Sequence, residues 1–233
     1  MTPLAPEIVL HLVEAGWPAE LVLGLSVQAI NGIYNQSGGG MVSHAGDTRF
    51  DTLLSSIASI QRSGVLVSEI EQHNGDSDML LMFREHPDLR IQSEIASVMK
   101  LLMLDPDLLR FRVSAGICPT ERDEIKLRTR SILMIIHALA MGIEVPNSQQ
   151  GETIDSTSGP GENNTKGLSH VRIWSSESPP EDSYAAIQYR NHWFWIDNSD
   201  VLSKRAFSFV QLLMNLSEGG GERKAPVLTL PTG

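Results

Sequence analysis

Apolar side chains in the first part of the chain recur with two spacings, which predict helices and strands. An apolar residue at every third or fourth position predicts helices over residues 19–34, 48–63 and 89–104, although the start of the third would also suit a strand. Asp47 offers a cap and Gly64 a stop for the second helix. Thr120 with Asp123 forms a capping pattern that predicts a long helix to Met141. Short runs of apolar and branched residues predict strands over 65–71, 79–84 and 109–114.

Residues 147–169 differ sharply from what precedes them. Their only aliphatic side chains are Ile154 and Leu168, so this stretch cannot form a packed layer. We interpret it as a flexible linker or long loop between an N-terminal α+β region, residues 1–146, and a C-terminal region, residues 170–233. The C-terminal region is predicted to contain three strands and then a helix, over residues 171–174, 184–189, 193–197 and 199–217.

These elements predict an α+β fold in which an antiparallel sheet packs against helices. We expect the C-terminal strands to complete a sheet formed by the earlier strands, so that both regions share one core. Near residues 47–84 the order of helix and hairpin is winged-helix-like, as in many DNA-binding domains. Residues 1–83, however, contain nine acidic and two basic side chains, whereas phosphate contacts need the opposite sign. The sequence therefore favours protein partners or self-association and argues against nucleic acid.

The overall composition is that of an acidic globular protein, with a net charge of −10 and 41% apolar residues. Residues 1–30 lack the basic start of an export signal. The apolar run 132–136 is far shorter than the roughly 20 residues of a membrane-spanning helix. The single cysteine, Cys118, excludes an internal disulfide, and we expect it to be a small buried thiol.

No motif in the chain indicates a cofactor or a metal site. The seven histidines lack the paired spacing of metal ligands, and His137, in an apolar stretch, is expected to be a hydrogen-bonded core histidine. Nucleophile elbows, phosphate-binding loops and dinucleotide fingerprints are absent. One basic cluster alternates with acidic residues and is predicted to be a solvated helix face. It consists of Arg122, Lys126, Arg128 and Arg130.

Aromatic residues concentrate in the C-terminal region, which also contains the candidate binding residues. In the predicted strand 193–197, Trp193, Trp195 and Asp197 share one face, because successive side chains of a strand point to opposite sides. That face would either belong to the core or present two exposed tryptophans to a partner.

The start of the last helix offers a second, polar group of candidates. Asp197 or Ser199 is expected to cap the helix, with Asp200 in its first turn and paired with Lys204 four residues on. The alternative is a dispersed polar site in which Asp197, Asp200 and Arg205 serve an enzyme.

Several segments together resemble a group of uncharacterised bacterial proteins. They are AGWPAEL with ING (15–21 and 30–32), LRTRS (127–131), the stretch from YR through WFWID to SKR (189–205), and APVLT (225–229). Longer members of that group begin like cell-envelope lipoproteins, so the resemblance implies a setting on the periplasmic side of the cell envelope. The missing export signal favours the cytoplasm instead. The resemblance carries no activity and no site residues.

Two hypotheses of function follow from the sequence. The first is a non-enzymatic binding or assembly module, with Trp193, Trp195, Asp197, Asp200 and Arg205 as its candidate residues. The second is an enzyme with the dispersed polar site described above.

Overall fold

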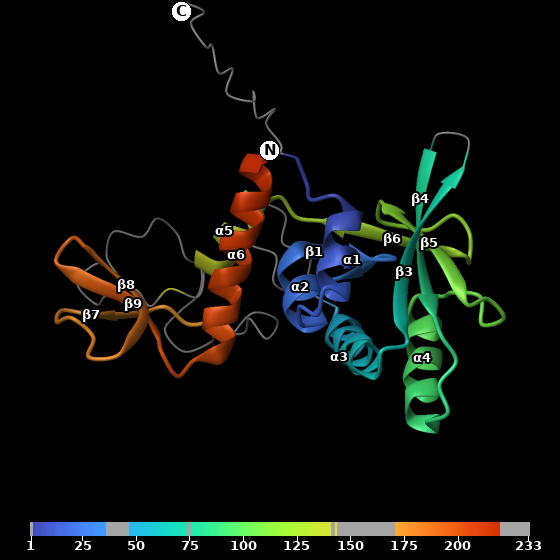
Figure 1. Cartoon of the computed structure of the whole chain (residues 1–233), viewed down its shortest axis with the longest axis horizontal. Helices are drawn as coiled ribbons and strands as arrows, with labels where there is room; N and C mark the ends of the chain where they lie inside the picture. The colour runs from blue at the N-terminus through green and yellow to red at the C-terminus, as the bar shows by residue number, and fades with distance from the viewer. Residues whose placement is uncertain (1, 36–46, 74–75, 141–142, 144–170, 220–233) are drawn as a thin grey trace, which may run out of the picture.

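The structure is a computed structural model, and it describes residues 2–35, 47–73, 76–140, 143 and 171–219 (Figure 1). Within these residues lie six helices and nine strands, which form an α+β fold. The helices are α1 (Pro6–Glu14), α2 (Ala19–Ser26), α3 (Thr48–Ser63), α4 (Leu89–Leu101), α5 (Ile132–Ala140) and α6 (Val201–Gly219). The strands are β1 (Val27–Ile30), β2 (Ile33–Tyr34), β3 (Leu66–His73), β4 (Asp76–Phe83), β5 (Arg110–Ala115), β6 (Glu124–Thr129), β7 (Trp174–Ser176), β8 (Ser183–Tyr189) and β9 (His192–Asp197). The predicted linker lies outside the described residues.

Six strands form one sheet in the order β2-β1-β6-β5-β4-β3. Every neighbouring pair is antiparallel except β5 and β6, which run parallel. Along β5 and β6 the side chains of Phe111, Val113, Ile125 and Leu127 are buried, and they join residues of α1 to α4 in one hydrophobic core. The opposite face of these strands is charged. This one-sided burial is typical of antiparallel sheets and accounts for the alternating sequence.

The segment from α3 to β4 matches its prediction closely. The Asp47 carboxylate accepts a hydrogen bond from the Arg49 backbone N–H at 2.9 Å and caps α3. The side-chain hydrogen bond from Arg49 also lowers the pKa of Asp47. Gly64 ends the helix with a φ of 75°, which a residue without a Cβ adopts at little cost. The helix–hairpin unit predicted near residues 47–84 is present, and its hairpin forms one edge of the six-stranded sheet.

The helix predicted over residues 19–34 is wrong beyond Ser26, where the chain changes to the β1–β2 hairpin. Asn31 and Gly32 have φ angles of 45° and 79°, the pair of positive values that a two-residue hairpin turn requires. The buried Asn31 side chain fixes this turn to its surroundings. Its amide donates to the carbonyls of Leu102 and Glu124, and its oxygen accepts from the Lys126 backbone N–H at 2.7 Å.

The long helix predicted from Thr120 is also wrong, because residues 124–129 form strand β6 and α5 begins only at Ile132. Thr120 binds the Glu124 carboxylate through its backbone N–H at 3.0 Å and its hydroxyl at 2.9 Å. The backbone bond is the largest cause that lowers the pKa of Glu124 to about 2. The apparent capping pattern is therefore a loop that leads into a strand.

The basic cluster of this segment is not a helix face. Arg130 is buried, and its guanidinium donates to the carbonyls of Gly24 and Leu25 at 2.9 and 2.8 Å, near the end of α2. Burial lowers the pKa of Arg130 to about 10. Arg128, by contrast, is exposed on β6 and donates to the Gln28 side chain. The two arginines differ because Arg128 belongs to β6, whereas Arg130 lies beyond its last residue, Thr129, where the chain leaves the strand.

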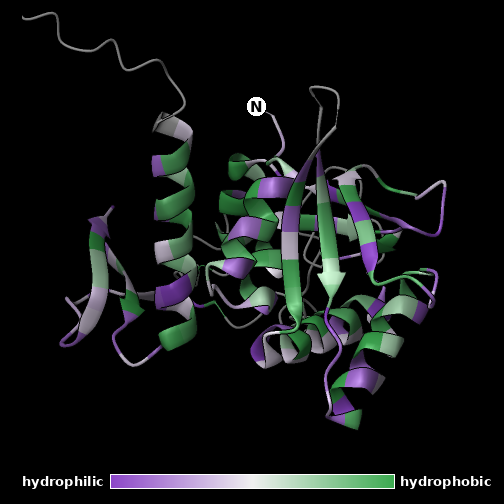
Figure 2. Cartoon of the chain, turned by 45° about the vertical axis from the view of Figure 1, so that its right-hand side comes forward, coloured by the Kyte–Doolittle hydropathy of each residue, from purple (hydrophilic) through white to green (hydrophobic). Residues whose placement is uncertain are grey.

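The prediction that the C-terminal strands complete the sheet of the earlier strands is wrong, because they form their own sheet in the order β7-β9-β8. This sheet lies on the far side of α6 from the larger one (Figure 1). The amphipathic helix α6 lies between the two parts. Figure 2 shows hydrophobic and hydrophilic positions alternating around it. Phe209 of α6 is fully buried, with its ring 5.6 Å from that of Trp17, and it belongs to the same buried cluster as the core of the larger sheet.

Candidate functional site

The predicted tryptophan face is neither a full core face nor an open surface. Trp195 is half-buried and stacks on Trp174 of β7, with ring centroids 6.1 Å apart at 26°. The Trp195 indole nitrogen is buried without a hydrogen-bond partner in the described part of the chain. Trp193 is also half-buried, and it lies opposite Ser176 and Gln188 on the neighbouring strands.

The two predicted aspartates organise the start of α6. The Asp197 carboxylate accepts hydrogen bonds from the Ser199 backbone N–H at 2.7 Å and hydroxyl at 2.6 Å, and these bonds lower its pKa. Asp200 caps the helix by accepting from the backbone N–H groups of Leu202 and Ser203 and from the Ser203 hydroxyl. The expected cap at Asp197 or Ser199 therefore lies at Asp200.

The predicted pairing of Lys204 with Asp200 is wrong. The Lys204 ammonium instead donates to the Asn198 carbonyl at 2.8 Å and lies 5.5 Å from the centre of the Tyr184 ring. Arg205 is exposed and lines a shallow pocket of about 680 Å³ with Trp17, Tyr184 and Lys204 among others. In the described residues no hydrogen bond or ion pair joins Arg205 to either aspartate, so the dispersed polar site does not converge there.

Two further predicted burials are wrong. Cys118 is exposed, in the connection between β5 and β6. His137 is exposed on α5, whose buried side chains are Ile135 and Ala138. An apolar run in sequence did not distinguish the faces of this helix. Among the residues that the structure describes, no three potential ligands gather as a metal site would need, and none of the helices is long and apolar enough to cross a membrane.

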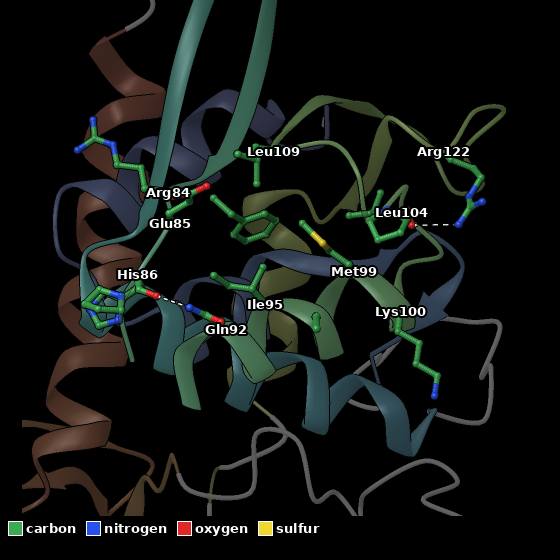
Figure 3. Close-up of a pocket in the computed structure, with 14 residues that line it drawn as sticks. Arg84, Glu85, His86, Gln92, Ile95, Met99, Lys100, Leu104, Leu109 and Arg122 are labelled. Carbon is green, nitrogen blue, oxygen red and sulfur yellow. Dashed lines mark hydrogen bonds between the residues drawn. The ribbon is translucent and has the colours of Figure 1, made fainter. Parts of the chain in front are cut away.

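A groove of about 1020 Å³ lies between α4 and the adjoining ends of β4 and β5 (Figure 3). We call it the α4 groove. Its lining residues come mainly from one stretch of chain and comprise Phe83, Arg84, Glu85, His86, Pro87, Gln92, Ile95, Ala96, Met99, Lys100, Leu104, Pro106, Leu109 and Arg122. Phe83, Met99 and Leu104 are buried beneath it, whereas Leu109 stays 48% exposed at its edge. The groove thus offers an apolar floor that is already formed.

The rim of the α4 groove is basic. Its charged side chains are Arg84, Lys100 and Arg122 against the single acid Glu85, in a chain whose net charge is −10. Figure 3 shows Arg84 at one end of the groove and Lys100 and Arg122 at the other. None of the three cations forms an ion pair with a described residue, although Arg122 donates to the Leu104 carbonyl at 3.3 Å. The rim can therefore receive negative charge at both ends.

Both walls of the groove are held by hydrogen bonds. Gln92 donates to the His86 carbonyl at 2.7 Å, and this bond ties the β4–α4 connection to the helix (Figure 3). Asp88 caps α4 by accepting from the Arg90 backbone N–H at 2.8 Å. On the other wall, the Phe83 backbone N–H donates to the Leu109 carbonyl at 3.1 Å. These contacts pre-organise the groove before any partner arrives.

Sequence reasoning missed the α4 groove. Pro87 lies just before α4 and Pro106 lies in the loop that follows it, so these two prolines bracket the helix in the sequence, which was a usable signal. No linear spacing, however, indicates that Leu109 and Arg122 face this helix, because the sheet brings them there. Comparison with protein-family models, with curated proteins and with solved structures finds no match to this chain.

Proposed function

We propose that the protein is a non-enzymatic binding module whose α4 groove accepts an apolar segment of a partner protein that also carries carboxylates. The observation that supports this most is an apolar floor bounded by three cations without ion-pair partners among the described residues. Burial of apolar side chains on the floor supplies affinity. The cations at both ends select an acidic segment and fix its direction.

The net charge of the chain does not prevent an acidic partner from binding. At physiological ionic strength the screening length is about 8 Å, so negative charges elsewhere on the surface are largely screened. The cations at the rim would lie next to the bound carboxylates and would be screened less. Binding should therefore weaken gradually with added salt, and the apolar contribution should persist.

We also propose a cell-envelope setting for this module, on the periplasmic side. This part of the proposal rests on the resemblance of segments 15–21, 127–131 and 189–205 to a group of uncharacterised bacterial proteins, whose longer members begin like cell-envelope lipoproteins. A cytoplasmic location is the alternative, and detection of the native protein in fractionated cells would distinguish the two.

A designed peptide would test the groove. The probe is a fluorescein-labelled peptide of leucine, phenylalanine and glutamate at helical spacing, and its control replaces every glutamate with lysine. Fluorescence anisotropy should show saturable binding of the acidic peptide and at least tenfold weaker binding of the basic one.

Charge-reversal variants locate the binding. The triple change of Arg84, Lys100 and Arg122 to Glu should weaken binding of the acidic peptide at least tenfold. Arg90→Glu is the matched control, because Arg90 is exposed on α4 but does not line the groove. Equal binding of both peptides, or an equal loss in Arg90→Glu, would contradict the proposal. Binding of a free fatty acid in place of either peptide would indicate a small-molecule site instead.

A further inference from the structure

The edges of the two sheets differ in how well they are protected from pairing with another strand. Edge strands expose backbone hydrogen-bonding groups, and proteins protect them by making them short, charged or covered. In the described residues β2 has two residues and β7 three, so both are short. Strand β3 carries the exposed acids Glu69 and Glu71, and the Ser68 backbone N–H is occupied by the Glu14 carboxylate.

Within the part of the chain that the structure describes, strand β8 has none of these three protections. It has seven residues, SYAAIQY, with no charged side chain and no proline. It pairs with β9 on one side, and no described strand pairs with its other side. Its Ile187 and Tyr189 side chains are 66% and 57% exposed. In an antiparallel ladder roughly half of an edge strand's backbone groups turn away from its neighbour. As far as the described residues go, the free side of β8 therefore presents unpaired backbone groups beside apolar side chains.

One end of β8 is fixed against α6, so the edge is held in place. Tyr184 packs edge-on against Phe207, with ring centroids 6.2 Å apart, and its hydroxyl lies 3.2 Å from that of Ser208. At the other end, the tight turn at Arg190 and Asn191 joins β8 to β9. A strand held at both ends needs little further ordering to accept a partner strand.

We propose that β8 pairs antiparallel with β8 of a second copy of this chain, so that two three-stranded sheets become one six-stranded sheet. Charge at the two ends of the strand favours this occupant. Asp182 precedes β8 and Arg190 follows it, and both are exposed. In an antiparallel pair centred on Ala186, Asp182 of each copy lies opposite Arg190 of the other. The neutral strand between them brings no like charges together, despite the net charge of −10.

A twofold arrangement also pairs the free β8 edges of both copies at the same time. Because the same strand contributes from each copy, the assembly closes as a dimer and leaves no unpaired β8. Ala186 at the centre has a small side chain that lets the two strands approach. The paired edges would cover Ile187 of each copy against Ala185 of the other. The α4 groove lies in the other part of the molecule, so this inference stands independently of the proposed function.

Analytical ultracentrifugation of the full chain over a range of concentrations tests the dimer. The chain should sediment as a monomer–dimer equilibrium, and Ile187→Lys should raise the dimer dissociation constant at least tenfold. Ile70→Lys is the matched control, since Ile70 is 52% exposed on the edge strand β3, whose edge is already protected. It should leave the dissociation constant unchanged. A chain that stays monomeric throughout, or a dimer weakened only by Ile70→Lys, would overturn the proposal.

A charge exchange tests the antiparallel register. Asp182→Arg and Arg190→Asp alone should each weaken the dimer severalfold, because each places like charges opposite one another. The double variant Asp182→Arg/Arg190→Asp should restore it to within about threefold of the original. Failure of the double variant to recover, while circular dichroism shows the fold intact, would rule out this register. Aspartate suits position 190, where φ is 47°.

Discussion

In the six-stranded sheet the central strands bury aliphatic and phenyl side chains completely, whereas the aromatic side chains of the three-stranded sheet are mostly half-buried. All six described helices add side chains to the hydrophobic core that includes the first sheet, whereas α6 is the helix that makes the main contacts with the second. The larger sheet is therefore stable through its own packing. The smaller sheet depends on its attachment to α6 and retains apolar surface for contacts outside the chain.

The largest change in stability should come from the contact through which α6 packs against the larger part. Phe209→Ala removes a fully buried ring beside Trp17 and should lower the free energy of unfolding by about 3 to 5 kcal/mol. Phe194→Ala removes a half-buried ring of the small sheet and should cost less than about 2 kcal/mol. Urea melts of both variants measure the difference. Equal losses would mean that the small sheet is packed as tightly as the core.

The next largest difference in stability is expected between the tight turns of the β1–β2 and β8–β9 hairpins. Asn31→Ala deletes three hydrogen bonds of a buried side chain, and we expect a loss of about 2 to 3 kcal/mol. Asn191→Ala is the matched change in the β8–β9 turn, at a φ of 65°, and should cost about 1 kcal/mol from backbone strain alone. Chemical denaturation gives both values. A larger loss at position 191 would reverse the ranking of the two turns.

A smaller effect is expected at the start of α6. Asp200→Ala removes an N-cap and should cost about 1 kcal/mol, whereas Asp200→Asn should be nearly neutral because asparagine caps equally well. Thermal melts followed by circular dichroism would show this difference. A marked loss in Asp200→Asn would indicate that the negative charge itself matters at this position.

The smallest effect is a gain in stability. Asn191→Gly should stabilise the protein by a few tenths of a kcal/mol, since glycine adopts the positive φ of this position without strain. The same change at Asn31 should destabilise, because there the side chain binds three backbone groups. A gain in the Asn31→Gly variant would show that those hydrogen bonds contribute little.

Much of the fold could be predicted where local signals agree with the tertiary structure. The cap at Asp47, the stop at Gly64 and the β3–β4 hairpin appear as the sequence pattern indicates. Prediction failed where a short run of apolar residues fits both the helical spacing and the strand spacing. The spacing of Leu21, Leu25 and Ala29 suits a helix, but the Asn-Gly turn that follows determines a hairpin.

The candidate site was less accessible to sequence reasoning. Asp197 and Asp200 lie where a strand meets a helix, so their polar pattern was visible, and their role proved to be local capping. The α4 groove depends on the position of Arg122, which α4, β5 and the loop after β5 together bring to it. Such non-local contacts leave no period in the sequence.

The central place of β6 in the larger sheet has a consequence for the newly made chain. β6 joins β1 to β5, yet its partner residues on β1 lie about 100 positions earlier. Before residues 124–129 emerge from the ribosome, the released chain contains a β1–β2 hairpin and then a β3–β4–β5 unit, each with an edge that β6 covers in the finished sheet. During synthesis the protein therefore passes through a stage with two additional open edges, when chaperones would matter most.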